Sequence, residues 1–281
     1  MLSMVNCDSK IVKCKEANIT RKVKTNDQVK AGGEYFLMLQ DYYIVHYGDS
    51  YDIHRLSDNT LIQQEIDYGF VHTGLGNSFI TDDSKSSHEL HNIHEDEVTV
   101  KIVEEPPPSW THKSGMTFYC DNSNYFLKEN GKVVQSFPVS WSSEHSWVTN
   151  CILGAIQPTR SVLCFDEDTK RIEKVVEKIP HNNNTGPFVA WDKTRHLLLF
   201  KYALFDTRNT TAPLMSFPHA MCFFQGHILF TNTRHQLCSL ALSHLDGVPQ
   251  QLGVYKPRDI FVRGEYLEVF SRNKRTTYTV I

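Results

Sequence analysis

A strand-ending signal recurs along the chain at nearly regular intervals, and this repeat limits the possible folds more than any other feature. Each signal is an apolar strand end followed by proline or an acidic residue. The signals are Ile66-Asp67, Glu105-Pro106, Phe137-Pro138, Ile179-Pro180, Phe217-Pro218 and Lys256-Pro257. Counted from 66, 106, 138, 180, 218 and 257, the steps are 40, 32, 42, 38 and 39 residues. A period of about 40–45 residues is typical of β-propeller blades. The repeat therefore predicts an all-β, seven-bladed β-propeller with one short blade.

Each interval also contains a compact β-rich run that ends in a turn. YFLMLQD (35–41) and GHILFTN (226–232) are two examples, in which branched or aromatic residues precede Asp or Asn. Only KRIEKVVEK (170–178) has apolar residues at a helical spacing. We expect it to be a strand in register with its counterparts in the other intervals.

The last interval is one strand short of a four-stranded blade. The strand-like segment 9–23 (SKIVKCKEANITRKV) belongs to no other interval. Pairing this segment with residues 258–281 leaves no exposed sheet edge, as a closed architecture requires. We therefore expect a single domain over residues 1–281, closed by its N-terminal strand. The expected blades are 27–66, 67–105, 106–138, 139–180, 181–218, 219–257 and 258–281 with 1–26.

Two segments resemble the WD-repeat family. VAWDKTRHLLLF (189–200) is similar to the first strand, turn and second strand of a WD-repeat, and AMCFFQGHILFTNTRHQLCSLAL (220–242) resembles another. The repeats are degenerate, because none ends in a Trp-Asp dipeptide. The resemblance implies a WD-like propeller and, by analogy, a scaffolding role, but it selects no subfamily.

Composition narrows the class of protein. The net charge of −3 argues against a dedicated nucleic-acid binder, which usually carries a basic excess. The seven cysteines are scattered and mostly lie in apolar runs, where a reduced thiol packs as a small hydrophobe. No apolar run approaches the roughly 20 residues that span a bilayer, and the first residues lack the apolar core of a secretory signal. These features predict an intracellular protein, cytoplasmic or nuclear.

No common catalytic or phosphate-binding motif occurs in the chain. The densest group of potential metal ligands is HELHNIHED, with His88, His91 and His94 spaced by three. On a helix these histidines would share one face and could bind a metal, whereas on a strand they point to opposite faces. We expect a solvated polar loop here, with no metal and no cofactor. An enzyme with a site at the channel mouth is the least favoured hypothesis.

Long connections in blades four and five favour one face as the binding surface. Pro138 to Ser161 and Pro180 to His196 are much longer than the equivalent connections elsewhere. Trp, Tyr and Arg often dominate binding interfaces, and such residues recur just past the strand-ending signals. Burial beneath the loop is the alternative for the two loop tryptophans; it is favoured for Trp147, while exposure is favoured for Trp141. The predicted partner-binding residues are Tyr68, Trp110, Trp141, Trp147, His181, His219 and Arg258.

The two ends of the chain are basic, with net charges of +4 over residues 1–31 and +3 over residues 256–281, while residues 32–255 carry −10. If the N-terminal strand closes the last blade, these segments become neighbours and could attract RNA, acidic peptides or anionic lipid. A soluble strand edge without this role is the alternative. The predicted patch contains Lys13, Lys15, Arg21, Lys22, Arg272, Lys274 and Arg275. The leading hypothesis is a non-enzymatic scaffold in a protein complex that binds a protein partner; a nucleic-acid or anionic-lipid binder is the alternative.

Overall fold

The fold is described here from a computed structural model of the 281-residue chain. The structure describes residues 9–19, 35–47, 50–66, 71–73, 76–82, 88–103, 110–112, 114–120, 124–138, 160–166, 168–179, 186, 188–272 and 274–281. These residues form β-strands joined by turns and contain no helix. The chain divides into two compact units, one of residues 17–138 and the other of residues 1–16 and 139–281.

The unit of residues 17–138 contains three antiparallel sheets, each made of four consecutive strands. The first sheet contains β2 (Tyr35–Met38), β3 (Tyr42–Tyr47), β4 (Ser50–Arg55) and β5 (Leu61–Ile66). The second contains β6 (Val71–Thr73), β7 (Ser78–Asp82), β8 (His88–His94) and β9 (Glu97–Val103). The third contains β10 (Trp110–Thr111), β11 (Thr117–Cys120), β12 (Asn124–Glu129) and β13 (Lys132–Pro138).

The other unit contains a two-stranded sheet followed by three four-stranded ones. The two-stranded sheet pairs β14 (Arg160–Asp166) with β15 (Arg171–Ile179). The next sheet contains β16 (Phe188–Asp192), β17 (Leu197–Phe200), β18 (Ala203–Asp206) and β19 (Met215–Ser216). It is followed by β20 (His219–Phe224), β21 (His227–Thr231), β22 (Gln236–Ala241) and β23 (Gln250–Tyr255). The last three strands are β24 (Asp259–Arg263), β25 (Tyr266–Ser271) and β26 (Lys274–Val280).

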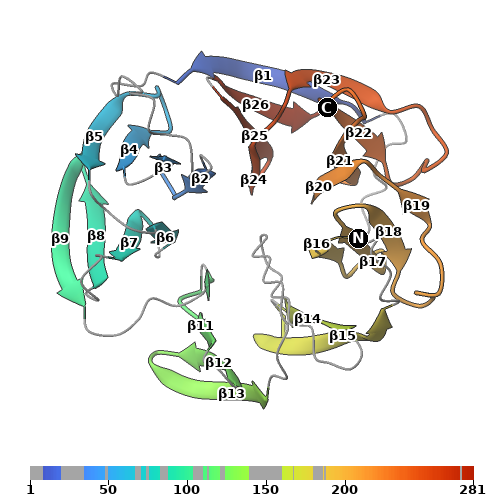
Figure 1. The fold of residues 1–281 in the computed structure, drawn as a ribbon, viewed down its shortest axis with the longest axis horizontal. Coiled ribbons are helices and arrows are strands. Elements are labelled where there is room, and N and C mark those ends of the chain that lie inside the picture. The colour runs from blue at the N-terminus through green and yellow to red at the C-terminus, as the bar shows by residue number, and fades with distance from the viewer. Residues whose placement is uncertain are drawn as a thin grey trace. The chain divides into compact units, whose positions relative to one another are not determined.

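The N-terminal strand completes the last sheet. β1 (Ile11–Asn18) pairs with β26, giving the order β1-β26-β25-β24 (Figure 1). Two backbone hydrogen bonds extend this pairing: Lys10 N donates to Ile281 O over 3.1 Å, and Ile281 N donates to Lys10 O over 3.0 Å. The prediction that the N-terminal segment closes the last blade is confirmed. The strand occupies residues 11–18 of the predicted 9–23.

The sheet of β20–β23 packs through both of its faces, and this explains its continuous apolar runs. Successive side chains of a strand point to opposite faces. Ile228 and Phe230 of β21 pack in a cluster with Leu199 of β17, whereas Leu229 packs with Leu267 of β25. Every residue of β21 is buried as a result. The two faces of this sheet therefore contact two different sheets of the same unit.

Two cysteines have the packing role that their apolar surroundings predict. Cys222 and Cys238 are free thiols buried in these clusters. Burial raises the pKa of Cys222 to about 12, because a thiolate loses its hydration in the core. Cys222 is therefore a protonated, small hydrophobic residue at neutral pH.

Two segments whose sequence patterns did not clearly indicate a strand form strands in the structure. Residues 170–178 lie almost entirely in β15, which confirms the expected strand. HELHNIHED was expected to be a polar loop, and this prediction is wrong for residues 88–94, which form β8. Ile93 packs in a core cluster with Phe79, and Leu90, on the opposite face of the strand, is half-buried. Only Glu95 and Asp96 form the following turn. Residues 88–94 form a strand despite their polar composition, because pairing in the four-stranded sheet buries some of their side chains.

Candidate functional site

Three of the predicted partner-binding residues have equivalent positions in three sheets. Trp110 is the first residue of β10 and His219 is the first residue of β20. Arg258 directly precedes β24, and its backbone N donates to Phe270 O over 2.7 Å. Each therefore lies where the first strand of a sheet begins. The sequence alone showed only that these residues follow a strand-ending signal.

His219 and Arg258 belong to the same unit, in which β20 and β24 are neighbouring first strands (Figure 1). Both side chains are exposed. The pKa of His219 is lowered, first by partial desolvation of its ring and second by the positive charge of Lys201. A neutral imidazole and a guanidinium are therefore presented at the same end of this pair of sheets.

The other predicted partner-binding residues lie outside the described part of the chain. They are Tyr68, Trp141, Trp147 and His181. The long connection after Pro138 and residues 180–185 also lie outside it. The binding role of these loops stays a prediction.

The closing sheet carries an exposed group of cationic side chains. Lys13 and Lys15 lie on β1, Lys274 begins β26, and Arg272 lies in the preceding turn; all four are exposed. Glu16 accepts hydrogen bonds from Lys13 Nζ and Lys274 Nζ, each over 2.7 Å. These two contacts lower the pKa of Glu16 to about 2. Glu16 thus links β1 to β26 and offsets part of the local positive charge.

Arg275 does not belong to that surface. Only 4% of the residue is exposed, and its Nε lies 3.6 Å from Glu268 Oε2. Glu268 is also buried and accepts a hydrogen bond from Thr277 Oγ1 over 2.8 Å. The alternation of β26 explains the correction, because Lys274 and Arg275 must point to opposite faces. Arg21 and Lys22 lie outside the described residues.

The three histidines of β8 do not converge. His91 is buried, and its Nε2 lies 2.9 Å from Thr81 Oγ1, with its ring stacked on Phe79 at 4.5 Å. His88 and His94 lie at positions of opposite parity and therefore point to the other face of the strand. In the described ranges, no three His, Cys, Asp or Glu side chains are grouped closely enough to hold a metal ion.

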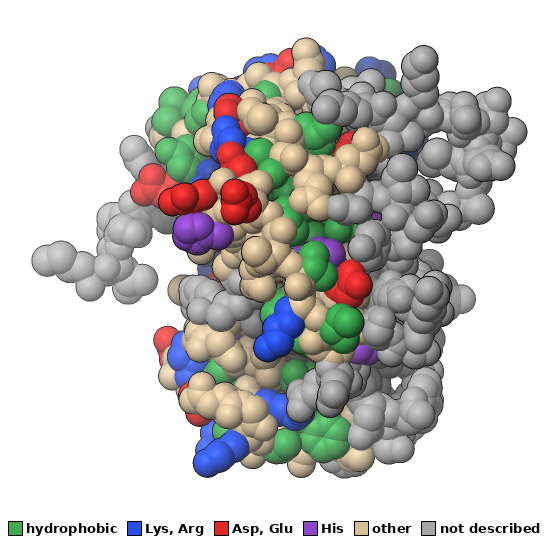
Figure 2. All heavy atoms as spheres, turned by 90° about the vertical axis from the view of Figure 1, so that its left-hand side faces the viewer, with side chains coloured by type: hydrophobic (Ala, Val, Ile, Leu, Met, Phe, Trp, Pro, Cys, Tyr) green, Lys and Arg blue, Asp and Glu red, His purple; other side chains and the backbone are tan. Residues whose placement is uncertain are grey.

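The outer strand of the same sheet exposes apolar side chains. Val100 and Ile102 of β9 are 52% and 69% exposed. Figure 2 shows hydrophobic side chains interspersed with charged ones on the side of the molecule that carries β9. Lys101 lies between them in the sequence, and a charge on an outer strand discourages pairing with another chain.

Sequence reasoning missed one further group of residues. A cavity of about 380 Å³ lies beside the N-terminal segment and is lined by residues including His227, Ser239 and Gln250. No sequence motif marks them, because they are ordinary strand residues that only the sheet register brings next to Ser9 and Lys10.

Five antiparallel sheets of four consecutive strands, and a sixth that the N-terminal strand completes, make this protein a β-propeller. The described residues include no helix long and apolar enough to cross a membrane.

No protein-family model and no curated protein matches the sequence. Among solved structures, Hsv2 of Kluyveromyces lactis is similar, with a TM-score of 0.48 and 12% sequence identity. The similarity covers 83% of this chain and 88% of that chain. A likeness of this degree supports no statement about a partner or an activity.

Proposed function

We propose that this chain is a non-enzymatic interaction scaffold, a subunit of a larger intracellular complex that binds a protein partner. The binding face contains the beginnings of the first strands and the long loops of blades four and five. The propeller has seven blades, and residues 139–180 form the fourth, to which β14 and β15 belong.

The observation that supports this proposal is the repeated position of large or charged side chains. Within one unit, His219 begins β20 and Arg258 directly precedes β24, so both lie at the beginnings of neighbouring first strands. In a propeller, equivalent positions of successive blades lie on the same face. Aromatic and arginine side chains contribute most to protein interfaces because they bury a large area and also form directional contacts.

A second candidate function is binding of nucleic acid or anionic lipid through the closing sheet. It is favoured by the exposed Lys13, Lys15, Arg272 and Lys274 on adjoining strands. Such binding would be mainly electrostatic and would weaken steeply with salt. Glu16 counts against it, because that carboxylate is bound to two of the four cations.

A pull-down from native extract, analysed by mass spectrometry, tests the leading proposal. The wild-type chain is expected to retain protein partners in stoichiometric amounts at both low and high salt. The variant His219→Ala/Arg258→Ala should lose them, because truncation at an interface often costs about 2 kcal/mol, roughly a thirtyfold loss of affinity.

The matched control is His244→Ala/Arg195→Ala. These exposed residues are of the same types but lie in turns at the opposite ends of their sheets. The control should retain the partners. Equal retention by both variants would contradict the proposed face, and retention of nucleic acid or vesicles at low salt alone would support the second function.

A further inference from the structure

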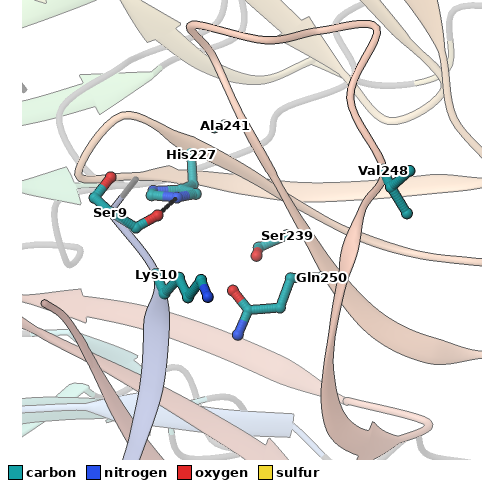
Figure 3. A pocket seen from close by; sticks show the side chains of 7 residues that line it. All are labelled: Ser9, Lys10, His227, Ser239, Ala241, Val248 and Gln250. Atoms are coloured by element: carbon teal, nitrogen blue, oxygen red, sulfur yellow. Dashed lines mark hydrogen bonds between the residues drawn. The ribbon is translucent and has the colours of Figure 1, made fainter. Parts of the chain in front are cut away.

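A cavity lies where the segment before β1 crosses the sheet of β20–β23. Its volume is about 380 Å³, and its lining comes from distant parts of the sequence (Figure 3). Ser9 and Lys10 come from the N-terminal segment, His227 begins β21, Ser239 lies on β22, and Val248 and Gln250 flank the beginning of β23. The cavity is at the opposite end of β21 from the residues that pair with His219.

Two polar side chains of the lining are already used to hold the N-terminal segment. The ring of His227 lies between two carbonyl oxygens, with Nδ1 3.2 Å from Gln225 O and Nε2 3.2 Å from Ser9 O. The Gln250 carboxamide donates through Nε2 to Ile11 O over 2.8 Å and accepts from Ile11 N over 3.3 Å. These contacts position the cavity wall, and they leave His227 and Gln250 few free hydrogen-bonding groups for a ligand.

One buried hydroxyl remains unused. Ser239 is 2% exposed, and among the described residues its Oγ has no hydrogen-bond partner. In Figure 3 this hydroxyl points into the space between Lys10 and Gln250. A buried donor without a partner is costly, so the hydroxyl has to be satisfied by whatever occupies the cavity.

Lys10 is the one Lys or Arg among the described residues of the lining. The ammonium of Lys10 extends toward Ser239 and Gln250 in Figure 3. The described residues that line the cavity include no Asp or Glu. The rest of the wall includes the methyl groups of Ala241 and of Val248, which is 95% exposed at the rim. One positive charge, one hydroxyl donor and a small apolar surface thus converge.

We propose that this cavity binds the carboxylate of a peptide. One carboxylate oxygen accepts a hydrogen bond from the Ser239 hydroxyl, the carboxylate pairs with the Lys10 ammonium, and the adjoining apolar side chain packs on Ala241 and Val248. Charge-assisted hydrogen bonds of this kind are among the stronger polar contacts in proteins. The volume lies in the range of small-ligand pockets, which combine apolar walls with a few placed polar groups.

A carboxylate fits this lining better than a phosphate does. It carries one negative charge, which the single lysine matches. A phosphate monoester carries close to two charges and three acceptor oxygens at neutral pH, more than one ammonium and one hydroxyl can satisfy. The site is separate from the face assigned above to the partner protein, so neither proposal depends on the other.

Binding at this cavity is coupled to closure of the fold. Two lining residues precede β1, and the other residues belong to the neighbouring sheet, so the site is complete only when β1 is paired. A ligand that binds only the closed state stabilises it in proportion to the logarithm of its concentration. We therefore expect the carboxylate ligand to raise the melting temperature.

The experiment uses the full chain and N-acetyl-leucine as the probe, with N-acetyl-leucinamide and inorganic phosphate as comparisons. Two-dimensional amide NMR and thermal melts are recorded for each. N-acetyl-leucine should give saturable shifts at Lys10, Ser239 and Ala241 and raise the melting temperature. The amide should bind roughly tenfold more weakly or worse, because the charge-assisted hydrogen bond is lost.

Ser239→Ala and Lys10→Gln should each weaken N-acetyl-leucine binding by a similar factor. Ser239→Ala should not lower the melting temperature of the unliganded chain, because it removes a buried hydroxyl that has no partner in the described structure. Ser243→Ala and Lys15→Gln, at exposed positions outside the lining, serve as controls and should bind normally. Equal binding of acid and amide, tighter binding of phosphate, or no saturable shift with any probe would each overturn the proposal.

Discussion

Asp96 Oδ1 accepts a hydrogen bond from Arg55 Nε over 3.1 Å, which joins the turn of one sheet to the end of a strand in its neighbour. Asp96 follows β8, and Arg55 is the last residue of β4. A second contact from the same neighbouring sheet reinforces this one, because Tyr42 OH donates to the same carboxylate oxygen over 3.0 Å. The pKa of Asp96 is lowered, chiefly by the hydrogen bond from Arg55.

Asp96→Ala should therefore lower the melting temperature by a few degrees. The substitution removes the hydrogen bonds from Arg55 Nε, Arg55 Nη2 and Tyr42 OH. It also places alanine at φ = 69°, a left-handed conformation that Asp, Asn and Gly adopt more readily. Asp96→Asn is the matched variant, since it keeps the turn preference and loses the charge and one of the two acceptor oxygens. A melting curve for each measures the difference; equal losses would mean that the turn conformation is unimportant.

The N-terminal closure gives a second prediction. Gln250→Ala should cost about 1–2 kcal/mol of unfolding free energy, because it removes both hydrogen bonds to the Ile11 backbone. Gln251→Ala, at the exposed neighbouring position, should change stability by less than about 0.5 kcal/mol. Denaturant titration measures both. Deletion of residues 9–23 should cause aggregation or loss of cooperative unfolding, and a soluble deletion with an unchanged transition would contradict the role of β1.

Stability should fall between pH 6.5 and about pH 4 because of His91. Burial lowers the pKa of His91 from 6.5 to about 4. In this window the unfolded chain binds the proton and the folded chain does not, so the contribution of His91 is complete above pH 6.5 and declines as the pH falls. The loss over the window is roughly 3 kcal/mol.

Denaturant titration at several pH values measures this effect. Thr81, Glu89, Phe79 and Tyr51 surround the ring, and Glu89 Oε2 lies 3.6 Å from Nε2. His91→Phe should flatten the pH dependence, whereas His94→Phe, at an exposed position of the same strand, should leave it in place. An unchanged slope in the His91 variant would assign the effect to other groups.

Chelators and reductants should leave the melting temperature unchanged. His91 points away from His88 and His94, so β8 cannot gather its three histidines around one ion. Cys222 and Cys238 are free and buried, and neither forms a disulfide. Thermal melts with EDTA and with dithiothreitol measure the two effects separately. A decrease of several degrees in EDTA would indicate a metal site that uses other residues.

Trp141→Ala should weaken partner binding by about thirtyfold and leave the melting temperature unchanged, if this tryptophan is exposed at the binding face. A buried tryptophan would instead cost roughly 3–5 kcal/mol of stability. The pull-down and the melting curve together distinguish the two cases.

The control for the cationic surface is Arg272→Glu/Lys274→Glu. Arg275 is left intact, because reversing a buried charge beside Glu268 would unfold the sheet rather than test the surface. Normal partner binding by this variant supports the long-loop face. Loss of binding here with normal binding by Trp141→Ala would assign the interaction to the closing sheet.

The period of the strand-ending signals was enough to predict the β-propeller and the closing N-terminal strand. Strands that end in tight turns require turn-forming residues, and these residues recur along the sequence because every blade is an antiparallel sheet. The sequence therefore predicted that the N-terminal strand pairs with the last blade, which lacks its fourth strand. The beginnings of β10, β20 and β24 followed from the same signals.

Register and packing were decided only by the tertiary structure. Lys274 and Arg275 are adjacent in the sequence, yet one is at the surface and the other is buried against Glu268, because β26 alternates between faces. HELHNIHED has the composition of a loop, but residues 88–94 form a strand because the neighbouring strands bury His91 and Ile93. Ser239 and Lys10 line the same cavity although more than two hundred residues separate them in the sequence. No local sequence pattern can predict such a long-range contact.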